Sequence, residues 1–205
     1  MIRAIIRIDF DSEWLIAGGR STIGSADMAP IRDSDGFPYI PGRSLRGVLR
    51  EAVATLDDCT ETRHTNRIFG NRITANAGDQ ETAEMGSSHV GSAYLAKEFV
   101  DKCGDADSRA DLFMSIKRTK INSSTRTATP GSLREMEVCI PGLVLFADIE
   151  LANEDDLRLL AFAAGLIRSI GHSKSRGLGR CRLAVVRDGK NVDQHNIPQM
   201  VGGRR

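Results

Sequence analysis

The sequence predicts an α+β fold in which two amphipathic helices cover one antiparallel sheet and a β-hairpin is inserted between two of the strands. Three observations support this prediction. Residues 2–10 alternate between apolar and charged side chains, which is the period of a half-buried strand. Apolar residues recur at helical spacing in 45–56 and in 154–170, so each half of the chain is expected to contain a helix. Residues 180–186 alternate again and predict a closing strand.

The composition is that of a soluble globular protein. The chain has 205 residues, of which 40% are hydrophobic and 27% charged, and this length suffices for one sizeable core. No apolar run approaches the roughly 20 residues that span a bilayer, and residues 1–10 do not resemble a signal peptide. The four cysteines lie far apart and form no CxxC pair, which indicates reduced thiols. We therefore expect a cytoplasmic protein without membrane association.

The first half of the chain is expected to contain a strand, a second extended segment and a helix. A glycine-rich connector at 17–26 follows the first strand, and the second extended segment ends at Ile40. Ser44 has the side chain of an N-cap for the helix at 45–56, because its hydroxyl can accept a hydrogen bond from the first turn. Residues 57–88 are polar and weakly patterned, so they predict a long, flexible loop.

The second half is expected to contain further strands and the second helix. In chain order we predict a strand at 90–99, a polar excursion at 101–111, a hairpin within 113–140 that is broken at 123–131, and an apolar strand at 143–151. Asn153 or Glu154 opens the helix that follows. Residues 191–205 form a polar tail that we expect to be disordered.

Two helices against one antiparallel sheet make a ferredoxin-like layer arrangement. We expect residues 1–190 to form a single domain of this kind. Proteins of this shape often bind RNA on the sheet face or through loops at its edge. The fold alone does not decide the function, which must be argued from particular residues.

The glycine-rich, basic stretch Gly171–Leu183 is the most informative part of the chain. Between Leu157 and Arg187 there are seven Lys and Arg residues and no Asp or Glu. Glycine lets a backbone approach a ligand closely, and successive N–H groups can form a concavity for an anion. The pattern predicts a polyanion as the partner. The alternative is an ordinary turn between a helix and a strand, with solvated arginines.

Three segments of the chain resemble one known family. Residues 32–50, RDSDGFPYIPGRSLRGVLR, resemble the GxPYIPGSSLKGxLR segment of the RAMP superfamily. Residues 176–180, RGLGR, resemble the C-terminal glycine-rich loop of that superfamily, and residues 120–146 resemble the thumb hairpin of its repeated backbone subunits. The single-domain length and the thumb segment resemble the backbone subunit of type III CRISPR effector complexes most closely.

The resemblance implies a modified ferredoxin-like (RRM-like) palm, with the hairpin at about 113–142 as a thumb. It also implies that copies of the subunit polymerise along a CRISPR guide RNA beside other RAMP subunits, and that each thumb interrupts the duplex of guide and target RNA. The RNA-binding residues that we expect on this basis are Arg43, Ser44, Arg46, Arg50, Lys120, Arg126, His172, Lys174, Ser175, Arg176, Gly177, Gly179 and Arg180.

The charge pattern agrees with this expectation. Arg43, Arg46 and Arg50 are three and four residues apart and share a helix face, where guanidinium groups can neutralise phosphates without reading sequence. The alternative is that Arg46 and Arg50 pair with Glu51 or other surface acids. His172 can contact phosphate, cap the preceding helix, or act as a general base as histidines do in metal-independent ribonucleases.

A carboxylate for RNA cleavage is implied by the same resemblance. Backbone subunits of this type carry an aspartate in the loop after the first strand, and Asp27 takes that place, with one residue more before Pro30 than in the family pattern. A carboxylate, directly or through a bound divalent cation such as Mg²⁺, can assist the attack of a 2′-OH on a kinked phosphate. Asp33 and Asp35 compete with Asp27, but Asp35 before Gly36 is better explained as a turn residue and Asp33 as support for that turn.

Two other functions stay open at this point. The chain can be a structural backbone subunit that holds RNA without cutting it. It can also be a stand-alone endoribonuclease that processes precursor CRISPR RNA, in which case a site centred on His172 is expected. A small-molecule enzyme on the same scaffold is a remote third.

Overall fold

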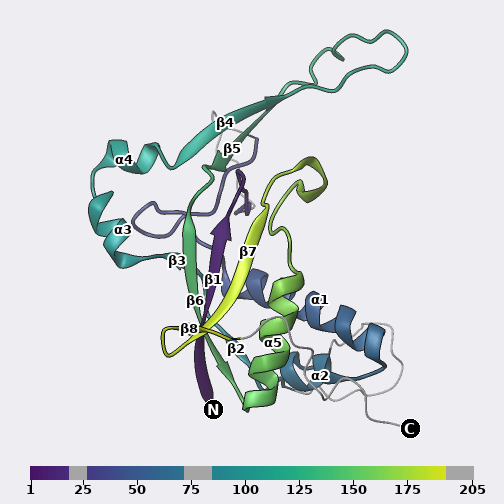
Figure 1. Ribbon diagram of the computed structural model, residues 1–205. Helices are drawn as coiled ribbons and strands as arrows, with labels where there is room; N and C mark the ends of the chain where they lie inside the picture. Colours follow the sequence, from purple (N-terminus) through teal and green to yellow (C-terminus); the bar gives the residue numbers. More distant parts are fainter. Residues whose placement is uncertain (19–26, 72–84, 193–205) are drawn as a thin grey trace.

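The computed structural model describes residues 1–18, 27–71 and 85–192. Its centre is an antiparallel sheet in the order β2-β6-β1-β7-β8, with β3 also paired to β6 (Figure 1). The strands of this sheet are β1 (Ile2–Phe10), β2 (His89–Val90), β3 (Tyr94–Leu95), β6 (Val144–Leu151), β7 (Cys181–Arg187) and β8 (Lys190–Asn191). The strand predicted at 2–10 is confirmed, and the one predicted at 180–186 is shifted by one residue.

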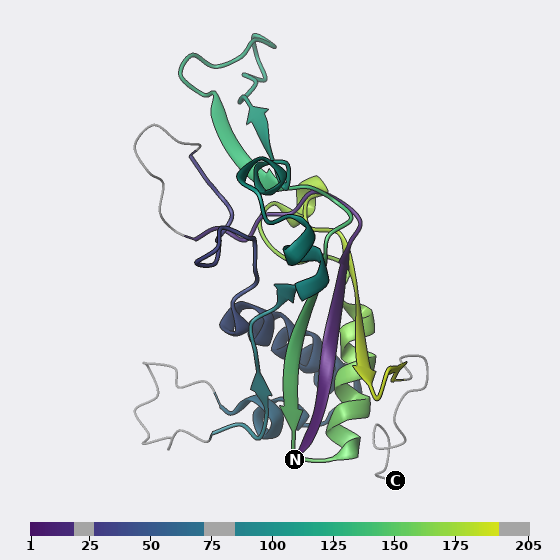
Figure 2. The same cartoon turned by 90° about the vertical axis from the view of Figure 1, so that its left-hand side faces the viewer.

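One face of this sheet is buried beneath two helices. In β1, every second side chain from Ala4 to Phe10 is buried, as the alternation of the sequence predicts. These side chains form one core with the apolar faces of α1 (Gly42–Thr60) and α5 (Glu154–Leu166), which pack against each other beside the sheet (Figures 1 and 2). The apolar spacing in both helices therefore gave the correct layer arrangement.

The two long helices differ from the prediction at their ends. Helix α1 begins three residues earlier than predicted, and Pro41 is its N-cap residue. The prediction that Ser44 caps the helix is wrong, because Ser44 lies inside the first turn and its N–H donates to Pro41 O at 2.9 Å. In α5, Asn153 is the N-cap as predicted, and its side chain accepts from the Asp156 N–H. This helix ends at Leu166 instead of residue 170, because the chain after it is drawn into backbone pairing with residues near Gly179.

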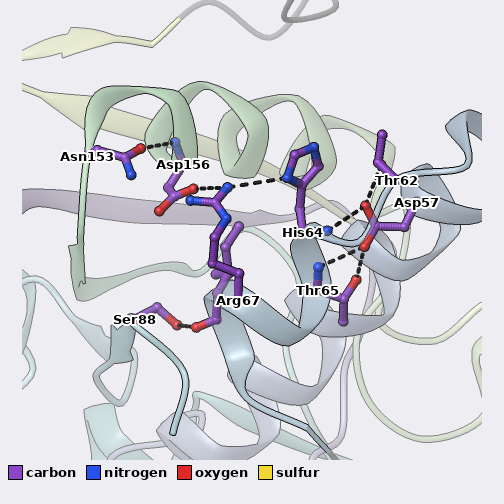
Figure 3. A network of polar contacts seen from close by, with 9 residues as sticks. Asp57, Thr62, His64, Thr65, Arg67, Ser88, Asn153 and Asp156 are labelled. Carbon is purple, nitrogen blue, oxygen red and sulfur yellow. Dashed lines mark hydrogen bonds and ion pairs between the residues drawn. The ribbon is translucent and has the colours of Figure 1, made fainter. Parts of the chain in front are cut away.

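The prediction of a long loop at 57–88 is wrong for most of the residues described there. The segment contains the end of α1 and a short helix, α2 (His64–Phe69). The buried Asp57 carboxylate holds this helix in place (Figure 3). It accepts hydrogen bonds from the hydroxyls of Thr62 and Thr65, both at 2.6 Å, and from the backbone N–H groups of His64 and Thr65. Residues 72–84 lie outside the described part of the chain.

An ion pair joins α2 to α5. Arg67 Nη2 lies 2.6 Å from Asp156 Oδ1, and the Asp156 side chain is fully buried. Figure 3 shows the Arg67 guanidinium between Asp156 and His64, whose Nδ1 is 3.3 Å away. A buried carboxylate needs such a partner, since isolating a charge from water is costly. Polar residues that looked like loop positions in the sequence therefore stabilise the packing of two helices.

The region between 89 and 111 also departs from its prediction. The prediction of a single strand at 90–99 is wrong. After β2 the chain leaves β6, and Ala93 pairs with Ile40 instead. It returns to β6 only in β3 and then forms two short helices, α3 (Lys97–Lys102) and α4 (Ala106–Ala110). Helix α4 begins at a capping residue, Asp105, whose side chain accepts from the Ser108 N–H at 2.8 Å.

A second, two-stranded antiparallel sheet projects from the end of the first. It consists of β4 (Phe113–Arg118) and β5 (Arg134–Cys139), and we call residues 113–139 the arm (Figures 1 and 2). Beyond these strands the arm closes through a small hydrogen-bonded turn, in which the Asn122 N–H donates to Thr127 O.

The C-terminal end of the described chain adds little to the core. Strand β8 pairs only with the end of β7, and residues 193–205, most of the predicted tail, lie outside the described part. Across the described residues, no helix has both the length and the apolar character that a bilayer crossing requires.

Candidate RNA interface

The stretch Gly171–Leu183, which we call the basic loop, is held in place by backbone contacts with the segment after β1. The His172 N–H donates to Leu15 O and the Gly179 N–H donates to Glu13 O, both at 2.7 Å. Ser12 Oγ accepts from the Arg180 N–H at 2.9 Å and donates to Gly177 O at 3.0 Å. The conformation of the loop is therefore fixed by contacts within the protein itself.

These contacts explain why glycine is required at two positions of the loop, and the reason differs from the one that the sequence suggested. A Cβ on Gly171 would lie 2.4 Å from Leu15 O, and one on Gly179 would lie 2.0 Å from Ile170 O. Both residues also have a positive φ. The close approach that requires glycine is thus to the backbone of the protein itself, and not to a ligand as the sequence suggested. Gly177 also has a positive φ, but its Cβ position is open.

The cations of the basic loop point outward. Lys174, Arg176 and Arg180 are exposed, and within the described chain none of them has an ion-pair partner. Arg182 differs, because it pairs with Asp11 at 2.9 Å. Several of these residues line an open hollow of about 720 Å³, together with Arg168, Ser169 and Ser12. Unpaired guanidinium and ammonium groups around a concavity make an electropositive surface that suits phosphate. His172 and Ser175 are exposed beside it.

Arg46 and Arg50 have another role. Arg46 donates to Ser88 O at 2.8 Å and to Phe69 O at 3.0 Å, and Arg50 donates to the same Phe69 carbonyl at 3.3 Å. They connect α1 to the segments on both sides of residues 72–84 through carbonyl groups, and Arg46 has no ion pair with an acid in the described part of the chain. Arg43 is exposed in the first turn of α1. RNA binding by these residues and by Ser44 stays a prediction.

Lys120 and Arg126 lie in the outer part of the arm, away from the basic loop. Both are exposed, and Arg126 adopts a positive φ of 54° in the turn that closes the arm. Two large apolar side chains near them are exposed as well, Ile121 at 57% and Leu133 at 61%. The structure therefore places the predicted RNA-binding residues in three separate groups: the basic loop, the first helix and the arm.

Asp27 lies along the edge of β5 that does not face β4. Its N–H donates to Glu135 O at 2.8 Å, and its Oδ2 accepts from the Glu135 N–H at 3.1 Å. Asp27 is exposed, and Oδ1 makes no hydrogen bond within the described chain. Asp33 accepts from the N–H groups of Asp35 and Phe37, so its predicted role as support for the turn is confirmed.

Asp27 offers an open carboxylate oxygen to a divalent cation. No cluster of three or more His, Cys, Asp or Glu side chains suited to a metal occurs within the described ranges. Mg²⁺ prefers oxygen ligands and commonly binds through one or two carboxylates and the phosphates of its substrate. Asp27 Oδ1 fits such a shared site, in which RNA supplies further ligands.

A small apolar cluster, separate from the main core, joins the basic loop, Asp27 and the arm. Leu178 of the loop packs with Leu15 and with Met136 and Val138 of β5. Met28, next to Asp27, packs against the same cluster from the edge of β5. The sequence analysis missed this cluster, because its members come from four distant segments.

The sequence of residues 7–182 matches the model of the RAMP superfamily. The chain belongs to this superfamily. The matched range contains the Asp27 segment, α1, the arm and most of the basic loop, so the candidate interface lies within the part that this RAMP protein shares with its family. A comparison of the chain with curated proteins found no match.

Solved structures share the fold of this RAMP protein. One chain of the type III-B Cmr-beta structure bound to cognate target RNA aligns with a TM-score of 0.70 at 12% identity, over 93% of this chain and 99% of that one. A chain of Cmr-beta in the apo state aligns with a TM-score of 0.67 at 12% identity, over 92% of this chain and 99% of that one. At this identity the likeness concerns the fold.

Proposed function

We propose that this RAMP protein is an RNA-binding backbone subunit of a type III CRISPR interference complex, and that it cleaves bound target RNA at regular intervals. The observation that carries the proposal is the juxtaposition of three parts around one apolar cluster. These parts are the unpaired cations of the basic loop, the exposed carboxylate of Asp27, and the projecting arm. The family membership and the fold shared with Cmr-beta chains support the same reading.

The fold is proposed to be a modified ferredoxin-like palm with the arm as its inserted thumb. The order β2-β6-β1-β7, with α1 and α5 on one face, is the order of a split βαβ fold in which each half contributes one helix. The arm leaves this arrangement between β3 and β6 and forms a sheet of its own. A projecting hairpin of this kind can reach a neighbouring copy or the RNA that both copies hold.

Guide RNA is the proposed ligand of the basic loop. Lys174, Arg176 and Arg180 carry charge without acidic partners in the described chain, so they are available to phosphates. Phosphate contacts bind without reading sequence, as a subunit that accepts any guide requires. The proposed partners are the guide RNA, the target RNA, other RAMP subunits and further copies of this chain, in the cytoplasm.

Asp27 is the proposed catalytic residue. Paired to the backbone of Glu135, near the outer end of the β4–β5 ladder, it presents Oδ1 beside the arm, where a target strand that runs along the arm would pass. Bound Mg²⁺ supplies charge neutralisation at the phosphate. The chain itself holds the carboxylate in place and positions the RNA so that a 2′-OH lies in line with the next phosphate, which provides much of the rate enhancement.

Reconstitution with guide RNA and matched target tests this proposal. Cleavage is measured with and without Mg²⁺ for the wild type, Asp27→Ala and the matched control Asp35→Ala, an exposed acid of the neighbouring turn. Regularly spaced cuts that need Mg²⁺ and are lost only in Asp27→Ala support the proposal. Intact target despite normal assembly leaves the role of a structural subunit. Metal-independent processing of precursor RNA that His172→Ala abolishes would contradict the proposal and favour the stand-alone ribonuclease.

A further inference from the structure

We infer that Arg118 and Arg134, at the outer end of the β4–β5 ladder, form an RNA phosphate-binding site that bridges the arm and the basic loop. This inference rests on the proposed function and adds a site to it. Neither arginine lines the hollow of the basic loop. The site is therefore distinct from the cations that the sequence singled out.

The register of the arm places the two arginines side by side. Arg118 of β4 is directly opposite Arg134 of β5. They lie two residues beyond Ile116 and Met136, and side chains two apart in a strand point to the same face. That face carries the apolar cluster and meets the basic loop. Arg118 Nη1 lies 3.4 Å from Ser173 Oγ of the loop, which confirms the direction in which this pair points.

This arrangement is unfavourable without an anion. Like charges directly opposite in an antiparallel pair destabilise it, and neither arginine has an acidic partner in the described part of the chain. Glu135, the nearest acid in sequence, belongs to the opposite face and accepts from Ser115. Arginines of the main sheet differ, since their partners are acids: Arg3–Glu150, Arg7–Asp9, Arg182–Asp11 and Arg187–Glu154.

A phosphodiester resolves the repulsion. Guanidinium groups bind phosphate oxygens through paired N–H donors, and two of them can share one phosphate or hold two successive ones. Arg134 precedes Glu135, whose backbone exchanges two hydrogen bonds with Asp27. A phosphate at this pair lies one residue along β5 from the backbone to which Asp27 is bound, and between the arm and the basic loop.

The substitution Arg134→Glu tests the inference, because its two expected effects have opposite signs. In the free protein it converts a repulsive pair into an attractive one, so Tm should rise by about 2 °C. Its affinity for a labelled single-stranded RNA of mixed sequence should fall about 10-fold, and the slope of log K against log salt should become shallower by about 0.7. Arg118→Gln should weaken RNA binding in the same way.

Arg3→Glu is the matched control. It changes the net charge equally, also on a strand, but it breaks the pair of Arg3 with Glu150. Its Tm should fall slightly while RNA affinity stays that of the wild type. Lys174→Glu separates this inference from the proposed function. If Lys174→Glu weakens RNA binding and the Arg134 and Arg118 variants do not, the arm site is overturned and the basic loop stands. If Lys174→Glu also has no effect, the proposed RNA-binding surface fails as well.

Discussion

In the basic loop, the exposed cations Lys174, Arg176 and Arg180 have no acidic partner within the described residues, whereas in α1 the guanidinium groups of Arg46 and Arg50 donate to backbone carbonyls. Both segments are basic, contain glycine and resemble family motifs. The difference teaches that a basic motif can present unpaired charge or stabilise the fold, depending on whether carbonyl groups lie within reach. Substitutions in the loop should change RNA affinity, and substitutions of the helix arginines should change stability.

The largest expected effect concerns a glycine of the loop. Gly179→Ala places a Cβ 2.0 Å from the Ile170 carbonyl oxygen, in addition to an unfavourable positive φ. We expect it to lower the free energy of unfolding by about 4 kcal/mol, as measured by urea denaturation. Gly177→Ala is the control, since it has the same kind of φ but open space around the Cβ. It should cost only about 1 kcal/mol. Equal losses would mean that backbone conformation, and not the close approach, requires Gly179.

The next effect tests the structural role of the helix arginines. Arg46→Met keeps much of the apolar side chain but removes donors to two carbonyl groups, so we expect it to lower the free energy of unfolding by about 3 kcal/mol. Arg43→Met, one turn earlier and exposed, should cost less than about 0.5 kcal/mol. RNA affinity of the folded Arg46→Met protein should stay close to that of the wild type. A large loss of RNA affinity at unchanged stability would mean that Arg46 binds RNA and does not stabilise the fold.

Asp57, near the C-terminal end of α1, also stabilises the fold, and its contribution to stability depends on pH. Desolvation opposes ionisation of Asp57, but hydrogen bonds from Thr62, Thr65 and the His64 N–H outweigh it and hold the pKa of this carboxyl below its ordinary value. A group with a lowered folded-state pKa stabilises the protein above its unfolded pKa and loses this contribution as the pH falls. Asp57→Asn should therefore cost about 2 kcal/mol at pH 7, and the difference from the wild type should shrink below about pH 4. Denaturation at both pH values measures it.

The smallest effect belongs to the loop cations. Lys174→Ala combined with Arg176→Ala should leave the unfolding transition unchanged, because neither side chain pairs with an acid in the described chain. Affinity for single-stranded RNA should fall about 10-fold. The slope of log K against log salt should become shallower by about 1.4. Filter binding over a salt series measures both. An unchanged slope would mean that these cations do not contact phosphate.

Local patterns in the sequence predicted the layers of the fold well. Alternation in residues 2–10 and helical spacing in 154–170 identify the side chains that face the core. The period of a strand or of a helix alone determines which side chains share a face. The prediction failed where polar side chains satisfy distant backbone groups. Asp57 and Arg46 look like surface residues in the sequence, yet one caps α2 and the other connects three segments.

The sequence by itself determined the strands β1, β6 and β7, the two long helices, the basic character of residues 168–182 and the membership in the RAMP superfamily. The tertiary structure alone decided which of the arginines are free, that Gly171 and Gly179 accommodate the backbone of the protein, and that Asp27 pairs with β5. The physical reason is how far apart the interacting residues lie along the sequence. A helix or strand follows from residues a few positions apart, but whether a charge meets an acid, a carbonyl or solvent depends on segments that lie from tens to more than a hundred residues away.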